Sequence, residues 1–470
     1  MEKRQIEEII KITKKNNLFC DTFFWYWYKK SHKFCNNEVI SEYDGIIEVI
    51  QKYGSPDIED LLVIFDILTS IKDSKKSKGI VYTPSEIVKV MVENAVACFD
   101  SVFTVIDPSC GSGIFIYYLA KAMHEKYKIS YYELFSKYIY GIDVDDIAAQ
   151  NTRNIIRCVL LSNRENDCVI NNIYNANSLK PDFLETLPKF DCCIGNPPYV
   201  RARNLDNRDL SLMNTWSFSS GNSDLYIIFF EIALKITKEN GIVSFITPNT
   251  YMKSLNGRNM RSFISKQKYH MSIMNFGSAQ IFSGATNYTC ITTFNKQITD
   301  GLVSYIEIQK INDLYNGKFT SFSYVSDNLK APWIFSNNIN ELEQIIIIKT
   351  QKKKLGSYVI RNGVATLAND IFIFKPKKED DNYFYHLVDG KLYPIEKGLC
   401  INMAKPNVIK NELELKSKCE VAIFPYFFGE NGKLLVIPET TLKEKYQKTY
   451  EYLLEYKNRL MMRDKGNLSK

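Results

Sequence analysis

Between residues 80 and about 300, short β-rich runs alternate with helical stretches, and this alternation limits the fold more than any other feature of the sequence. Strands that alternate with helices are typical of an α/β fold with a mostly parallel, doubly wound sheet. In such a Rossmann-like sheet, ligands bind at the carboxyl ends of the strands. The predicted strands are Phe103–Ile106, Tyr138–Ile142, Val169–Tyr174, Asp191–Ile194, Ile242–Thr247, Ser272–Phe276 and Thr289–Phe294.

The segments on either side of this pattern are predicted to have other kinds of secondary structure. Apolar residues recur at helical spacing within residues 1–75, which predicts an N-terminal helical segment. After residue 300 the regular order is lost, and short apolar runs, turns and lysines predict a mixed α+β domain, ending in a helical stretch at Leu442–Met462. We therefore expect three parts, 1–75, 76–300 and 301–470, as the length of 470 residues allows.

Composition excludes several classes of protein. No apolar run approaches the roughly 20 residues that span a bilayer, and Met1–Glu8 does not resemble a signal peptide. The 11 cysteines are scattered without a CxxC pattern, which is typical of reduced thiols in a cytoplasmic protein. With only 4 histidines, widely spaced, we expect no histidine-rich metal site.

The basic residues are unevenly distributed. Residues 331–470 carry 23 Lys and Arg against 17 Asp and Glu, a balance of +6 out of the net +7 of the whole chain. The segment 253–268 is also basic. A basic second part beside a nearly neutral first part indicates a polyanionic partner, although a lysine-rich composition gives the same signal.

The first motif is the segment Thr104–Phe115, in which a β run ends at Asp107-Pro108 and a turn with Gly111 and Gly113 leads into a helix. Glycine lets the backbone adopt positive φ and pass close to a ligand. The third glycine of a dinucleotide fingerprint is missing, which disfavours NAD. The alternative interpretation is a tight strand-to-helix turn without a ligand.

The second motif places an acid, Asp143, at the end of the next β run. An acid at this position can bind the hydroxyl pair of a ribose. The alternative is that the acids here only cap a helix, an interpretation that suits Asp145 and Asp146. Together, the two motifs indicate a cofactor that carries a nucleoside.

The third motif is the sequence Asn196-Pro197-Pro198-Tyr199, which follows a buried β run. The two prolines stiffen the loop and remove two N–H donors. The Asn196 side-chain oxygen and the Pro197 carbonyl can accept the two hydrogens of an amino group on a flat ring, while Tyr199 stacks on that ring. These three groups predict the catalytic site.

With these motifs, the chain resembles the gamma class of S-adenosylmethionine-dependent adenine-N6 DNA methyltransferases. This class includes the methylases of type II restriction–modification systems and of fused restriction–methylation enzymes. The resemblance covers roughly residues 75–300 and implies a methyltransferase sheet, with residues 301–470 as a target-recognition domain that binds double-stranded DNA. The cofactor that it implies is S-adenosylmethionine.

The resemblance also implies roles for single residues. Tyr82-Thr83-Pro84 matches the motif that wraps the methionine end of the cofactor, and Asn177-Ser178 falls where an Asp usually contacts its adenine. Phe282 matches the aromatic that packs edge-on against the flipped target base, opposite the face-on Tyr199. Asp224-Leu225-Tyr226 and Gly241–Pro248 match the intervening motifs. The residues implied in cofactor binding are Tyr82, Thr83, Pro84, Asp107, Pro108, Gly111, Gly113, Asp143, Asn177, Ser178 and Asn196.

DNA contacts are expected at four arginines, with solvated loop charges as the alternative. Relatives usually continue beyond the pattern at Tyr452–Arg463, so we expect a recognition domain that is short, that lacks a piece, or that a second polypeptide completes. A cognate restriction endonuclease is the other expected partner. The four arginines are Arg201, Arg203, Arg258 and Arg261.

Three alternative functions remain beside this one. The chain could be a DNA-binding subunit that has lost catalysis, or a methyltransferase of RNA or of protein glutamine, because those enzymes share the Asn-Pro-Pro-Tyr motif. A nuclease is disfavoured: Pro56-Asp57 and Asp73-Ser74-Lys75 fit a PD…DxK pattern, but the intervening Leu61–Leu68 is predicted to be helical.

Overall fold

The computed structural model forms two compact units, Met1–Thr350 and Gln351–Lys470. The sequence placed this boundary at residue 300. The difference arises because two further strands join the central sheet after that point. The residues that the structure describes are 8–9, 11, 27–30, 32, 54, 56–72, 83–165, 171–220, 222–277, 288–309, 313–324, 331–351, 366–404, 414, 418–429 and 433–463.

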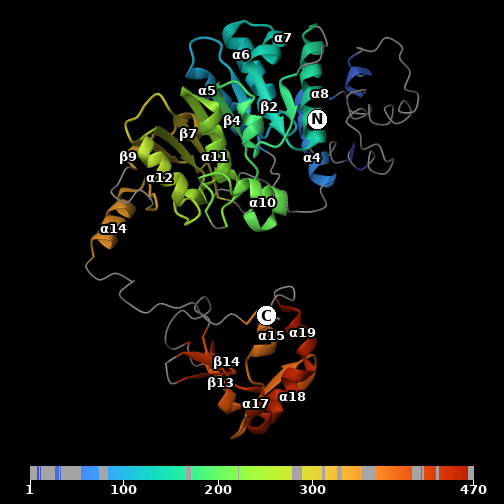
Figure 1. Cartoon of the computed structure of the whole chain (residues 1–470), viewed down its shortest axis with the longest axis vertical. Coiled ribbons are helices and arrows are strands. Elements are labelled where there is room, and N and C mark those ends of the chain that lie inside the picture. Colours follow the sequence, from blue (N-terminus) through green and yellow to red (C-terminus); the bar gives the residue numbers. More distant parts are fainter. Residues whose placement is uncertain are drawn as a thin grey trace. The chain divides into compact units, whose positions relative to one another are not determined.

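The first unit is built on a nine-stranded sheet with the order β3-β2-β1-β4-β5-β7-β6-β8-β9 (Figure 1). Strands β3, β2, β1, β4 and β5 are parallel neighbours. Strand β7 runs antiparallel between β5 and β6. The predicted doubly wound α/β fold is confirmed. The strands are β1 (Val105–Asp107), β2 (Ile139–Asp143), β3 (Ile173–Asn175), β4 (Phe190–Gly195), β5 (Thr237–Pro248), β6 (His270–Asn275), β7 (Thr289–Asn295), β8 (Leu302–Glu307) and β9 (Thr320–Ser323).

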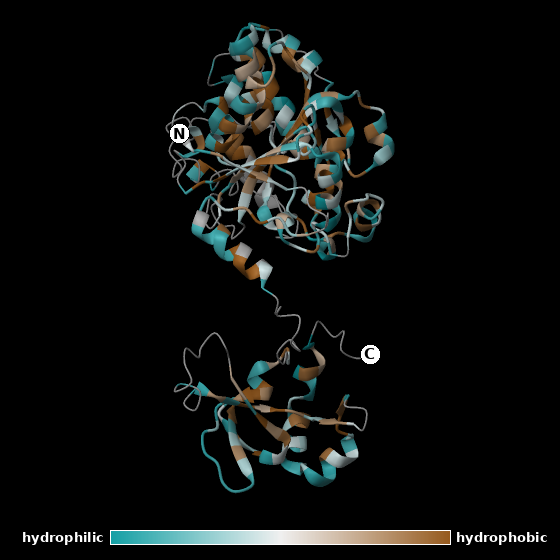
Figure 2. Cartoon of the chain, turned by 90° about the vertical axis from the view of Figure 1, so that its left-hand side faces the viewer, coloured by the Kyte–Doolittle hydropathy of each residue, from teal (hydrophilic) through white to brown (hydrophobic). Residues whose placement is uncertain are grey.

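Helices cover both faces of this sheet, because alternate residues of the central strands point to opposite sides. In β5, Ile242 and Ile246 belong to a core shared with α5 (Ser85–Ala97), α6 (Ile114–Tyr127) and α8 (Asp146–Ser162). Val243 and Phe245 belong to a core shared with α11 (Leu225–Ile236) and α12 (Arg258–Gln267). Figure 2 shows hydrophobic strands at the centre of the unit, with the hydrophilic residues of the helices toward the outside. The unit therefore has three layers, as a parallel sheet requires.

The apolar stretch Leu225–Ile236, interrupted only by Glu231 and Lys235, forms α11, which is a core helix: 10 of its 12 residues are buried. None of the helices in the described part of the chain combines the length and the apolarity needed to cross a membrane. The α-helices of the unit whose bounds the structure describes are α4 (Ile58–Lys72), α5 (Ser85–Ala97), α6 (Ile114–Tyr127), α7 (Tyr131–Glu133), α8 (Asp146–Ser162), α9 (Pro181–Glu185), α10 (Asn207–Met213), α11 (Leu225–Ile236), α12 (Arg258–Gln267), α13 (Asp313–Asn316) and α14 (Ile339–Thr350). Helix α4 contains the predicted helix at Leu61–Leu68.

The second unit is small and mixed α+β, as predicted for this part of the chain. Its described strands form a three-stranded sheet of order β10-β14-β13 and two separate hairpins, β11–β12 and β15–β16. The predicted helical stretch Leu442–Met462 is divided among three short helices. Its elements are α15 (Asn369–Phe372), β10 (Ile373–Phe374), β11 (Tyr383–Val388), β12 (Lys391–Glu396), β13 (Cys400–Met403), β14 (Glu420–Ile423), β15 (Tyr426–Phe428), β16 (Leu434–Val436), α17 (Glu439–Lys445), α18 (Gln447–Glu455) and α19 (Lys457–Met461).

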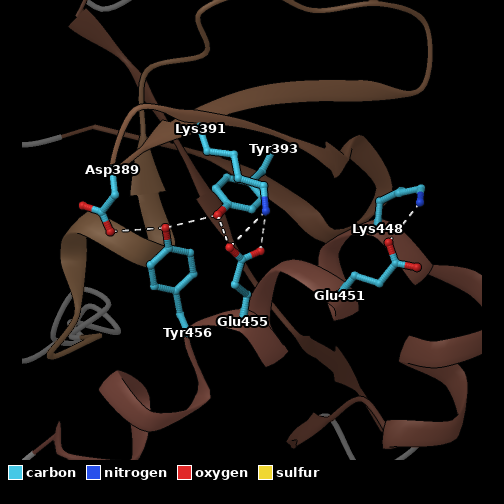
Figure 3. A network of polar contacts seen from close by, with 7 residues as sticks. All are labelled: Asp389, Lys391, Tyr393, Lys448, Glu451, Glu455 and Tyr456. Carbon is cyan, nitrogen blue, oxygen red and sulfur yellow. Dashed lines mark hydrogen bonds and ion pairs between the residues drawn. The ribbon is translucent and has the colours of Figure 1, made fainter.

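Polar contacts attach the hairpin β11–β12 to α18 (Figure 3). At the C-terminal end of α18, Glu455 accepts hydrogen bonds from Lys391 Nζ at 2.8 Å and Tyr393 Oη at 2.7 Å. At the N-terminal end of α18, Glu396 of β12 accepts from the backbone N–H groups of Lys448 at 2.8 Å and Thr449 at 2.7 Å. Glu396 thereby satisfies two donors of the first turn of α18, where a negative charge also stabilises the helix.

We predict that Glu396→Ala destabilises α18, because both capped N–H groups lose their acceptor. The local free energy of opening should fall by about 1–2 kcal/mol. Hydrogen exchange of the α18 and β12 amides in the full-length chain measures this change. The control is Glu451→Ala, which removes an exposed pair with Lys448 (Figure 3) and should leave exchange near wild type. Equal acceleration in both variants would contradict the capping role.

Candidate active site

Four of the predicted site residues lie where neighbouring parallel strands of the sheet end. Asp107 ends β1, Asp143 ends β2, and Asn196 directly follows β4. Asn177 follows β3 by two residues. Because β3, β2, β1 and β4 are neighbours in that order, these four side chains lie along the edge in the same order. The strand ends thus bring together motifs that are far apart in the sequence.

Hydrogen bonds connect the glycine turn after β1 to the end of β2. The Asp143 carboxylate accepts hydrogen bonds from the Gly111 amide at 2.8 Å and from the Asp145 amide at 2.9 Å. The Thr152 hydroxyl donates to the Gly111 carbonyl at 2.8 Å. Gly111 has a φ of +54°, and no atom lies within 4 Å of the position that a Cβ would take. The outer side of this turn is therefore open.

Asp145 has the role of a helix cap, as the alternative interpretation of the second motif stated. Its carboxylate accepts from the amides of Ile147 at 2.9 Å and Ala148 at 3.2 Å, at the start of α8. Asp143 instead lies between the glycine turn and this cap. The two acids of the motif therefore have different structural roles.

Asp107 is buried beside the end of β4, with only 1% of its surface exposed. Its Oδ1 accepts from the Ser109 amide at 2.9 Å, and a Cβ on Gly195 would lie 2.4 Å from the same oxygen. The close approach of these two strand ends therefore requires glycine at 195. Burial raises the pKa of Asp107 to about 8, against the effect of the Ser109 hydrogen bond. Burial also raises the pKa of Asp143 to about 6, against its backbone hydrogen bonds.

The Asn196–Tyr199 loop is held at both ends. Asn196 Nδ2 donates to the hydroxyl of Thr83 at 2.9 Å, and Thr83 is buried. The hydroxyl of Tyr199 donates to the Ile246 carbonyl on β5 at 3.0 Å. The Tyr199 ring packs edge-on against Tyr226, with 6.2 Å between the ring centroids. Both the amide and the ring are thus fixed in orientation by groups from other elements.

Next to Asn196, Pro197 is buried and Pro198 is half-buried. The Ser109 hydroxyl donates to the Asn196 carbonyl at 3.4 Å, which connects the loop after β4 to the loop after β1. On the other side of β1, the Ser178 hydroxyl donates to the Pro108 carbonyl at 2.7 Å. The loops after β1, β3 and β4 are therefore linked by hydrogen bonds.

Asn177 has two side-chain contacts. Its Oδ1 accepts from the Leu179 amide at 2.9 Å, and its Nδ2 donates to Asp209 Oδ1 at 2.9 Å. Asp209 belongs to α10, which the sequence did not connect with the site. The link between Thr83 and Asn196 was also missed, since Thr83 was assigned only to the cofactor. Neither contact leaves a periodic signal in the sequence.

The four arginines differ in accessibility. Arg201 and Arg203 are exposed and Arg258 is half-buried. Arg261 is buried, and its guanidinium donates to the carbonyls of Ala331, Tyr251 and Ser254. It connects α12 to neighbouring loops, so we no longer propose it as a DNA contact. Tyr82 and Phe282 lie outside the described residues, and their roles stay predictions.

The burial of Asp107 predicts a specific pH dependence of stability. Between its ordinary pKa of 3.8 and its folded pKa of about 8, this carboxyl is ionised in the unfolded chain and protonated in the folded one. Its stabilising contribution is complete below pH 3.8. It decreases as the pH rises toward 8, by about 1.4 kcal/mol per pH unit. Asp107→Asn removes this dependence and should gain stability relative to wild type from pH 5 to pH 8.

Urea unfolding followed by tryptophan fluorescence measures this difference in the first unit, because all 4 tryptophans precede residue 351. Asp146→Asn, at an exposed position in the first turn of α8, is the matched control. A constant difference between Asp107→Asn and wild type across this pH range would contradict the burial effect.

The sequence of this chain is similar to that of known methylases. Residues 137–282 match the model of the Eco57I restriction-modification methylase family. The type II restriction enzyme and methyltransferase RM.Eco57I of Escherichia coli is 26% identical over 81% of this chain. The type II methyltransferase M.HincII of Haemophilus influenzae is 26% identical over 48% of it. The chain spans 45% and 38% of the lengths of these two relatives.

Solved structures share the fold. The DrdV–DNA complex matches with a TM-score of 0.53 at 17% identity, over 71% of this chain and 40% of that chain. The Type ISP restriction-modification enzyme LlaBIII bound to DNA matches with a TM-score of 0.52 at 17% identity, over 76% and 31%. These structures show the fold alone. The family match and the sequence relatives confirm the resemblance predicted from the sequence: this chain is similar to the methylases of type II restriction–modification systems, including the fused restriction enzyme and methyltransferase.

Proposed function

We propose that this chain is a DNA methyltransferase that transfers a methyl group from S-adenosylmethionine to N6 of an adenine flipped out of duplex DNA. The observation that carries the proposal is the fixed orientation of the Asn196 amide. Because Nδ2 donates to Thr83, the amide presents its acceptor atom, Oδ1, on the opposite side. An oriented acceptor beside a rigid proline backbone and an aromatic ring suits an exocyclic amino group.

The amino group of adenine is a poor nucleophile, because its lone pair is delocalised into the ring. Asn196 Oδ1 and the Pro197 carbonyl accept hydrogen bonds from its two N–H groups and localise the lone pair toward the methyl donor. As the N–C bond forms and the S–C bond breaks, N6 releases one of these protons to solvent. Tyr199 stacks on the face of the base, which offsets part of the few kcal/mol needed for flipping. The hydroxyl bond to Ile246 holds the ring in position beforehand. Catalysis then consists of positioning and of preorganised dipoles.

The residues present fit the cofactor. A nucleoside with a charged amino-acid tail needs hydroxyl acceptors and a backbone that it can approach closely. Asp143 supplies the acceptor, and the open outer side of Gly111 allows the approach. S-adenosylmethionine supplies the electrophilic methyl group. Thr83 and Pro84 lie near Asn196, where the methionine end would have to bind for the methyl group to reach the target amine.

Duplex DNA is the proposed substrate. Arg201 and Arg203, both exposed, are proposed to bind phosphates beside the flipped nucleotide. Residues 351–470 form the unit proposed to bind the rest of the DNA site. A cognate restriction endonuclease, or a second polypeptide that completes recognition, is the proposed partner. The proposed setting is the cytoplasm of a cell with a restriction–modification system.

The test is methyl transfer by the purified full-length chain, with labelled S-adenosylmethionine and separate DNA, RNA and protein substrates. We expect label in DNA, recovered as N6-methyladenine. Asn196→Ala should lower the turnover number by roughly 100-fold or more, because a preorganised acceptor is lost. Its cofactor dissociation constant should change much less than the turnover number, since Asn196 acts mainly on the target amine and reaches the cofactor end of the site through Thr83.

Each other result identifies a different function. Label in RNA or protein alone would replace the proposed substrate. Cofactor binding without transfer to any substrate would favour the non-catalytic subunit. Equal loss of cofactor binding and turnover in Asn196→Ala would contradict the proposed role of this residue.

The raised pKa of Asp143 predicts that cofactor affinity depends on pH. Above pH 6 the carboxylate is ionised and can accept from the ribose hydroxyls. As the pH falls through about 6, it becomes protonated and affinity should fall, by about 10- to 100-fold at the limit for a lost charge-assisted pair. Calorimetric binding of S-adenosylhomocysteine from pH 5 to pH 8 measures this change.

Asp143→Asn is the informative variant for this prediction, because its amide oxygen can still accept one of the backbone bonds from Gly111 and Asp145. It should bind weakly at every pH in the range. A wild-type affinity without pH dependence, or an Asn variant that binds as tightly as wild type, would reduce Asp143 to a structural link.

A further inference from the structure

The order of the strand ends fixes the direction in which the cofactor lies. For methyl transfer to an amine bound at Asn196, the sulfonium must lie near the end of β4. If the ribose is bound by Asp143 at the end of β2, the base extends away from β4. The next strand in that direction is β3, because the order is β3-β2-β1-β4. This step rests on the proposed function.

The loop after β3 contacts the segment that holds Asp143. The amide of Ala176 donates to the Asp143 carbonyl at 2.9 Å, and Asn175 Nδ2 donates to the same carbonyl at 3.2 Å. Asn177, the next residue, is half-buried at the edge of this loop. A base attached to a ribose at Asp143 would therefore lie against Asn177 and against Asp209, to which the Asn177 side chain donates.

The amide orientation of Asn177 is set by two contacts. Its oxygen accepts from the Leu179 amide in a local turn, and its nitrogen donates to Asp209. A carboxylate has about four acceptor positions, of which Asn177 uses one. Asp209 is half-buried, and it adds to this end of the site the negatively charged acceptor that Asn177 lacks.

Helix α10 is held in this position by a second contact. The Trp216 indole N–H donates to the Leu179 carbonyl at 3.0 Å, and Met213 at the end of α10 is completely buried. The amide of Asp209 donates to Asp206, which caps the helix. The Asp209 carboxylate is therefore placed against the loop after β3 by contacts on both sides of it.

We propose that Asp209 accepts a hydrogen bond from the exocyclic amino group of the cofactor's adenine, and that Asn177 is the positioning residue that orients the Asp209 carboxylate. A charged acceptor distinguishes adenine from a base with a carbonyl at this position. The carbonyl oxygen of hypoxanthine would face the carboxylate without a proton between them. The pair Asn177–Asp209 thus determines which nucleoside the cofactor carries.

The experiment compares two ligands of the full-length chain by calorimetry. S-adenosylhomocysteine carries the amino group, and S-inosylhomocysteine carries a carbonyl oxygen in its place. Wild type should bind the adenosyl compound at least about 10-fold more tightly, as for one charge-assisted hydrogen bond. In Asp209→Asn, the Asn177 amide keeps an oxygen partner, and the new amide N–H faces the base. This variant should lose the preference or reverse it.

The matched control is Asp206→Asn, which removes the same charge from the same helix and keeps a side chain that caps well. It should show the wild-type preference. If Asp209→Asn keeps the wild-type preference, or if Asp206→Asn loses it equally, the assignment of Asp209 is wrong while the proposed function stands. If wild type binds both ligands with equal affinity, the assignment of Asp209 is likewise wrong and the proposed function stands. Wild type that binds neither ligand would overturn the proposed function itself.

Discussion

The two hydrogen bonds accepted by the Asp143 carboxylate determine the shape of this site. One comes from the glycine turn after β1 and the other from the residue that caps α8. Because β1 and β2 are parallel neighbours, with Asp107 opposite Gly141, their loops leave the sheet side by side and one side chain can connect them. Burial disfavours the ionised form of both Asp107 and Asp143. Hydroxyl groups of a ligand that donate to the Asp143 carboxylate would stabilise its ionised form and offset part of this effect of burial.

The parts of the fold that depend on local patterns were predictable from the sequence. A short β-rich run with polar residues after it defines a strand and its end, so β4 was predicted at Asp191–Ile194 and lies at Phe190–Gly195. The motifs were found for the same reason, since each follows such a run directly. Parallel strands then bring those motifs to one edge, which is a property of the fold class.

Contacts between distant residues were not predictable. Thr83 and Asn196 are 113 positions apart, and Asn177 and Asp209 are 32 apart. A side-chain hydrogen bond of this kind leaves no trace in hydropathy or spacing. The burial of Arg261 was not predictable either. A basic segment predicts exposed charges, whereas this guanidinium is buried and donates to backbone carbonyls. The continuation of the sheet beyond residue 300 depends on the pairing of β8 with β6, and a β-rich run does not specify its partner.

The segment between Tyr199 and α11 connects the proposed site of the target amine with the proposed site of the cofactor's base. It begins at the Asn196–Tyr199 loop, where the Leu225 amide donates to the Val200 carbonyl at 2.7 Å and the Ala202 amide donates to the Ser223 carbonyl at 3.2 Å. In its middle, α10 and Trp216 are attached to the loop after β3. Contacts at the end that would bind the base of the cofactor therefore also restrain the chain that follows the Asn196–Tyr199 loop. Binding energy gained far from the reacting atoms can in this way contribute to their positioning, which is how remote contacts accelerate a transfer that depends on orientation.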